Sequence, residues 1–176
     1  RVARFASRFH KLGFSIAPET RKLMQQMVVS GEVDALVPER VFKELSLALC
    51  SDKPSIFFDV LLESSAYHRL FPMLSSTESH ITQLVDASAG DLEVKFALWL
   101  HQEKLENITA LCSQLRCPKG YQQVAELVSE WHIFCRDLLS HSAQEVLDFY
   151  LQTDSLRRQK RFEKLLIALK ELGTDI

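Results

Sequence analysis

The sequence has little of what breaks helices or marks an extracellular or membrane protein. It contains five glycines and five prolines among 176 residues, and its four cysteines never form a C-x-x-C motif. That irregular spacing argues against a zinc site and predicts reduced thiols, as is typical of cytoplasmic proteins. No apolar run approaches the ~20 residues that a membrane helix needs, so we expect no membrane partner. The formal net charge is -2, so any attraction to nucleic acid has to come from local basic patches.

Catalytic motifs are also missing from the sequence. It holds no Gly-rich phosphate loop, no G-x-S-x-G elbow and no H-x-x-x-H pair. His101 is followed by Gln102, where a His-Asp phosphohydrolase would carry an aspartate. We therefore predict neither catalytic residues nor metal ligands in this chain.

What the sequence does have is helical periodicity. Apolar residues recur at spacings of three and four, as in Val2, Phe5, Phe9 and Leu12, after which Gly13 ends the helix. No segment alternates with the period of two that a half-buried strand shows. The pattern predicts an all-α fold, a compact array of roughly nine to ten short helices with no sheet.

Prolines and capping residues mark where several helices begin. Pro18 and Pro38 suit a first helical turn, while Ser142 and Ser155 suit N-caps. The helix that follows Pro18 is expected to bury one apolar stripe. Its members are Leu23, Met24, Met27 and Val28.

Two groups of basic residues stand out. The first, on the opening helix, consists of Arg1, Arg4, Arg8 and Lys11. The second, on the closing helix, consists of Arg157, Arg158, Lys160, Arg161 and Lys164. Guanidinium and ammonium groups held on a rigid helix suit contacts with RNA phosphates. The other interpretation is a solvated face that only keeps the helix soluble.

The opening segment resembles the neck helix of bacterial class II tRNA nucleotidyltransferases, the CCA-adding enzymes, and of the related poly(A) polymerases. The resemblance rests on residues 1–14, 18–20, 24, 27, 30–32, 38–44, 54–61 and 70–72. A weaker resemblance continues through 94–101, 116–119, 125–132 and 157–163. It implies a neck with an RNA- and SrmB-type binding domain over residues 1–72. Residues 73–176 would be a body and tail with a degenerate remnant of the phosphohydrolase lobe that lacks the His-Asp pair.

The resemblance also implies what this chain does and does not carry. In the family a catalytic head, where Mg²⁺ and CTP or ATP bind, precedes the neck helix. Because the chain starts within a helical pattern, we expect it to be part of a longer protein with that head N-terminal to Arg1. The helices here would hold the acceptor arm of tRNA, by its shape and phosphates, in a cytoplasmic enzyme that adds or repairs the 3′ CCA end. This segment alone is expected to be inactive.

The expected RNA contacts combine the two basic groups with two cations of the third helix. They are Arg1, Arg4, Arg8, Lys11, Arg40, Lys43, Arg157, Arg158, Lys160, Arg161 and Lys164. For Arg1 and Arg4 the alternative is an ion pair with acidic residues of the head. Two other functions stay open: the same region of a poly(A) polymerase, and a helical protein-interaction adaptor without an RNA role.

Overall fold

The computed structural model describes residues 1–75 and 79–174, and all regular structure within them is helical. There are eleven α-helices and three short 3-10 helices, and no strand among the residues described. The all-α prediction is therefore confirmed, with slightly more helices than expected. No helix in the described part is long and apolar enough to span a bilayer.

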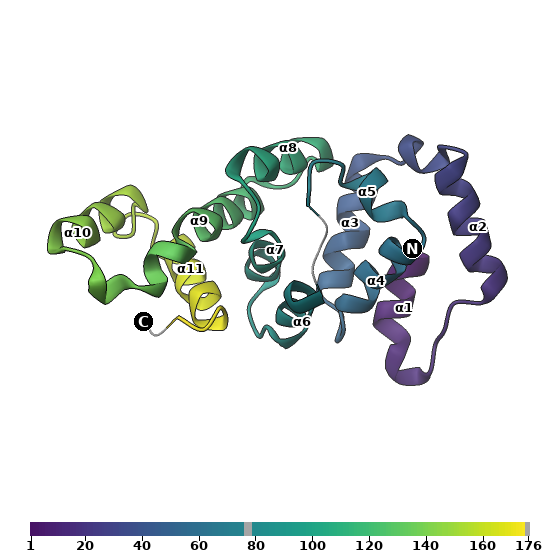
Figure 1. Ribbon diagram of the computed structural model, residues 1–176, viewed down its shortest axis with the longest axis horizontal. Helices are drawn as coiled ribbons and strands as arrows, with labels where there is room; N and C mark the ends of the chain where they lie inside the picture. The colour runs from purple at the N-terminus through teal and green to yellow at the C-terminus, as the bar shows by residue number, and fades with distance from the viewer. Residues whose placement is uncertain (76–78, 175–176) are drawn as a thin grey trace. The chain divides into compact units, whose positions relative to one another are not determined.

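The helices follow one another through short connections (Figure 1). The α-helices are α1 (Val2–Phe9), α2 (Pro18–Val29), α3 (Pro38–Leu49), α4 (Ser55–Glu63), α5 (Ala66–Leu70), α6 (Ser79–Ala87), α7 (Leu92–Leu100), α8 (Leu105–Leu115), α9 (Lys119–Arg136), α10 (Ala143–Gln152) and α11 (Gln159–Glu171). The 3-10 helices are η1 (His10–Leu12), η2 (Glu32–Ala35) and η3 (Leu138–Ser140).

Most helix ends follow from local chemistry. Pro18 and Pro38 are the first residues of α2 and α3, where a missing N–H costs nothing. Gly13 adopts a left-handed φ of 74° after η1, a conformation that favours glycine because it has no Cβ. The Ser142 hydroxyl accepts from the Glu145 amide, and the Glu145 carboxylate accepts from the Ser142 amide, so a capping box starts α10.

The N-cap predicted at Ser155 is wrong. The closing helix begins only at Gln159, and its N-cap residue Arg158 makes no side-chain capping bond. The Ser155 hydroxyl instead donates to the carbonyl of Tyr150, 3.1 Å away, and so completes the end of α10. Ser155 lies four residues before Gln159, too far from the first turn of α11 to serve as its N-cap.

The described residues form two compact units that interleave along the chain. The first unit contains residues 1–87 and 110–117, and the second contains 88–109 and the remainder from 118 onwards. One helix, α8, therefore begins in the second unit and ends in the first. This division differs from the one at residue 72 that the family resemblance implies, which stays a prediction.

Each unit has its own core. In the first, α1 packs on α3 and α4, and α4 packs on α5 and α6, around the fully buried Leu45, Phe58 and Phe71. In the second, α7, α9 and α11 pack together around buried residues such as Phe96 and Leu165. Aliphatic and aromatic burial of this kind supplies the main stabilising term for helices as short as these.

Candidate nucleic-acid interface

The basic group of the opening helix is largely engaged within its own unit. The Nε atom of Arg4 donates to Glu44 of α3 at 2.6 Å, and the Nε atom of Arg1 lies 3.6 Å from the same carboxylate. Burial alone would raise the pKa of Glu44, but the hydrogen bond from Arg4 and the nearby positive charges outweigh it, so the pKa is lowered. For Arg1 and Arg4, the structure thus shows an acidic partner on α3. The predicted alternative, an ion pair with acidic residues of the head, stays a prediction.

The two remaining cations of that group differ from each other. Lys11 lies in η1, because α1 ends at Phe9, so it does not continue the predicted helical stripe. Its Nζ atom lies 2.8 Å from the carboxylate of Asp52. Arg8 is exposed, and its guanidinium carbon lies 5.5 Å from the ring centroid of Phe9. Within the described residues, Arg8 has no carboxylate partner and remains available to an external anion.

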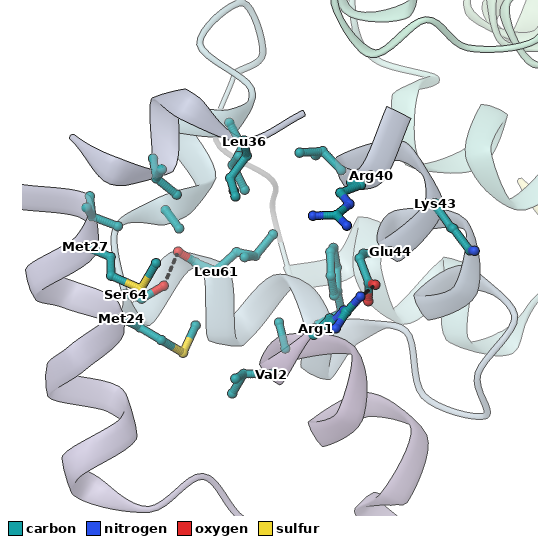
Figure 2. A pocket seen from close by; sticks show the side chains of 17 residues that line it. Arg1, Val2, Met24, Met27, Leu36, Arg40, Lys43, Glu44, Leu61 and Ser64 are labelled. Atoms are coloured by element: carbon teal, nitrogen blue, oxygen red, sulfur yellow. Dashed lines mark hydrogen bonds and ion pairs between the residues drawn. The ribbon is translucent and has the colours of Figure 1, made fainter. Parts of the chain in front are cut away.

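Arg40 and Lys43, one turn apart on α3, also remain available. Both side chains are exposed and neither forms an ion pair with any described residue. They border a cleft of about 500 Å³ inside the first unit. Figure 2 shows Met24 and Met27 on one side of this cleft and Arg40 on the other.

This cleft was not predicted from the sequence, because the apolar residues of α2 that line it were expected to be buried in the hydrophobic core. The apolar stripe of α2 was predicted to be buried, yet no residue of α2 is fully buried. Met24, Met27 and Val28 are only half-buried because they line the open cleft. A helix with an apolar face looks the same in sequence whether that face meets a core or a cleft.

Two of the five cations of the closing basic group are engaged within the second unit. The Nζ of Lys164 lies 2.7 Å from Asp91 and 2.6 Å from Glu93, both at the start of α7. Burial lowers the pKa of Lys164, but its hydrogen bonds to Asp91 and Glu93 outweigh that effect, so the pKa is raised overall. Arg161 donates to the carbonyl oxygen of Thr153. These two cations therefore stabilise the second unit.

The other members of the closing group face solvent. Arg158 and Arg157 lie 3.3 Å and 4.0 Å from the carboxylate of Asp154, in exposed pairs that contribute little. Lys160 is exposed and has no ion-pair partner among the residues that the structure describes. Of the eleven predicted cations, Arg8, Arg40, Lys43 and Lys160 are thus the most available to phosphate.

His101, which the family resemblance assigns to a degenerate phosphohydrolase remnant, belongs to no candidate metal site among the described residues. His101 is buried, with its Nδ1 2.7 Å from the carbonyl oxygen of Leu98. Its ring packs edge-on against His132, with centroids 5.3 Å apart. Across residues 1–75 and 79–174, no group of three or more His, Cys, Asp or Glu side chains is placed to hold a metal ion.

Comparison with known proteins defines the class to which this helical region belongs. Residues 13–77 match a family described as "Probable RNA and SrmB- binding site of polymerase A". The chain is 36% identical to the multifunctional CCA protein of Thioalkalivibrio sulfidiphilus and 37% identical to that of Alkalilimnicola ehrlichii. Both alignments cover 96% of the chain and 50% of the relative. It is also 36% identical to the CCA-adding enzyme of Pseudomonas putida, over 94% of the chain and 45% of that enzyme.

The chain belongs to the family of CCA-adding enzymes and poly(A) polymerases, and it corresponds to the C-terminal part of its members. It spans about half the length of the curated relatives it matches. No solved structure matches the chain.

Proposed function

We propose that this chain is the tRNA-binding part of a CCA-adding tRNA nucleotidyltransferase. The names and extent of the relatives support this assignment, because the alignments run over almost the whole chain. In this proposal the helices hold the acceptor arm of tRNA in the cytoplasm. Nucleotidyl transfer, with its Mg²⁺ and its CTP or ATP, belongs to an N-terminal head that this chain does not contain.

The observation that carries the proposal is the set of exposed helical cations without an internal partner. Arg8 on α1 and Lys160 on α11 point into solvent and are not neutralised by any described carboxylate. A-form RNA presents phosphates and 2′-hydroxyls to a protein, and recognition of shape needs such cations and not base-reading pockets. A surface that is slightly acidic overall binds RNA only where free cations gather.

Whether a cation has an internal partner divides the predicted RNA contacts into two roles. Arg8 and Lys160 contact phosphate directly, and Arg157 and Arg158 can exchange an exposed aspartate for phosphate at little cost. Arg4 and Lys164 hold helices together and affect RNA only through folding.

Fluorescence anisotropy with a tRNA transcript tests the assignment. We expect the 176-residue chain to bind weakly, with an affinity that falls steeply as salt rises. Arg8→Gln and Lys160→Gln should each weaken binding several-fold and reduce the salt slope by about one. Lys104→Gln, at an exposed lysine outside the predicted set, is the matched control and should leave binding unchanged. Equal losses in all three variants, or no binding at low salt, would refute the proposal.

The poly(A) polymerase alternative rests on the description of the matching family, which names polymerase A. It shares the RNA-binding role proposed here and differs in the product. Sequencing the 3′ ends made by the complete enzyme distinguishes CCA ends from long adenosine tails.

A further inference from the structure

The cleft of the first unit is chemically unlike an RNA-binding surface. Its volume of about 500 Å³ falls in the range of roughly 300–1,000 Å³ typical of ligand clefts. Its walls are largely aliphatic and thioether side chains, among them Met24 and Met27 of α2, Leu61 of α4 and Leu36, which directly follows η2. Phe57 is the one aromatic side chain in its lining. Bases bound by proteins normally stack on aromatic platforms and meet polar groups that read their edges.

Two polar side chains that line the cleft, those of Ser64 and Glu44, are already engaged. The Ser64 hydroxyl donates to the carbonyl of Val60, 2.8 Å away, and so completes the end of α4. It also lies 3.2 Å from the carbonyl of Leu61, the contact that Figure 2 draws. Glu44 is held by Arg4 and Arg1. Apart from its cations, the cleft therefore offers an occupant apolar surface and almost no hydrogen-bonding partner.

The rim of the cleft is positively charged. Arg1, Arg40 and Lys43 line it, against the single carboxylate of Glu44. Arg40 and Lys43 have no ion-pair partner in the part of the chain that the structure describes. Apolar walls beside uncompensated cations complement an occupant with apolar side chains on one face and carboxylates next to them.

We propose that this cleft docks an acidic amphipathic helix of a protein partner. Its apolar residues, at spacings of three and four, enter between Met27, Leu36 and Leu61. Its flanking carboxylates meet Arg40 and Lys43. Methionines suit this role because their unbranched side chains adapt to different apolar shapes. The proposal does not depend on the RNA role, because Arg8 and Lys160 do not line the cleft.

Anisotropy of a fluorescein-labelled synthetic peptide tests this directly. The peptide carries leucines at spacings of three and four and glutamates between them. Its control has the same composition in scrambled order. We expect the patterned peptide to bind the 176-residue chain at least tenfold more tightly than the scrambled one. Equal binding of the two peptides would overturn the proposal, because it would show that charge alone governs the contact.

Three protein variants, one of them a control, test the cations and the apolar walls of the cleft separately. The double variant Arg40→Glu/Lys43→Glu should weaken peptide binding at least tenfold, while Lys22→Glu/Lys53→Glu, an equal charge reversal outside the cleft lining, should change it less than twofold. Leu36→Asp, at a half-exposed residue of the apolar wall, should abolish binding while circular dichroism shows unchanged helicity. If Leu36→Asp instead leaves the peptide bound and weakens tRNA, the cleft is an RNA site and the proposal is wrong.

Discussion

Arg4 of α1 and Glu44 of α3 form a hydrogen-bonded ion pair of 2.6 Å in which both side chains are mostly shielded from water, with exposed fractions of 11% and 21%. Their positions in the sequence differ by 40. Arg1 reaches the same carboxylate at 3.6 Å but is 72% exposed. One largely shielded carboxylate thus links the opening helix to α3 within the first unit.

Arg4→Met should lower the free energy of unfolding by about 2 kcal/mol, because it leaves the Glu44 carboxylate half-buried without its donor. Urea denaturation measures the change. Arg1→Gln is the internal control and should cost less than about 0.5 kcal/mol, since an exposed pair at long distance contributes little. Equal costs for the two variants would show that Arg4 is not the anchoring partner.

Stability should fall in acid. The pKa of Glu44 is lowered because Arg4 and the nearby charges outweigh burial, and the pKa of Asp91 is lowered because Lys164 and the Val94 amide do the same. A carboxyl whose pKa is lower in the folded state stabilises the fold above its unfolded value and loses that contribution as pH drops through the folded value. Urea midpoints should therefore decline below about pH 4.5, the ordinary glutamate value. Glu44→Gln should flatten the decline, and an unchanged slope in that variant would contradict its assigned cause.

Lys164→Met should destabilise the second unit by about 1–2 kcal/mol, because Asp91 and Glu93 are left close together without their shared cation. Differential scanning calorimetry of the variant is the measurement. Lys170→Met, at an exposed lysine on the same helix, should stay within about 0.5 kcal/mol of the parent protein. A normal melting temperature combined with lost tRNA affinity in Lys164→Met would instead assign this lysine to RNA.

Gly90→Ala should cost about 1–3 kcal/mol through overpacking. A Cβ at this position would lie 2.4 Å from Cγ1 and 2.7 Å from Cβ of Val94, whose side chain is fully buried and has no room to move. The backbone amide of Gly90 is also held by Glu171 of α11 at 3.2 Å. Ala89→Ser, at the exposed neighbouring side chain, should leave the urea midpoint unchanged. If Gly90→Ala has the same urea midpoint as the unmodified protein, the backbone at the start of α7 can shift to make room for the added methyl group.

Helix positions were predictable because their determinants are local. Pro18, Pro38 and the capping box at Ser142 act within a few residues, so the sequence places these starts correctly. The start of α11 was misplaced because a serine between two helices can bond either to the helix before it or to the helix after it. Only the structure shows that the Ser155 hydroxyl donates to the carbonyl of Tyr150, in the preceding helix. Short 3-10 turns such as η2 have too few residues to produce a periodic pattern.

The candidate interface was less predictable, because ion pairing is long-range. The spacing of Arg4 and Lys164 identifies basic groups, but their partners Glu44 and Glu93 lie 40 and 71 positions away. Which cations are neutralised, and which of them remain available to RNA, depends on how helices pack. The cleft escaped prediction for the same reason, since the apolar face of α2 does not reveal what covers it.

Because the two units interleave along the chain through α8, neither truncation nor recombination at a single point between Ser88 and Cys117 separates them cleanly. Residues 110–117 belong to the first unit, although 22 residues of the second, Ser88–Thr109, separate them from the rest of it. A fragment ending at Ala87 would lose the segment that carries the buried side chains of Leu111 and Leu115. Recombination between homologous genes anywhere from Ser88 to Cys117 would mix the parentage of one unit or both. We therefore expect recombination points between homologous genes to be rare within the codons for residues 88–117, so that both units come from the same parent gene.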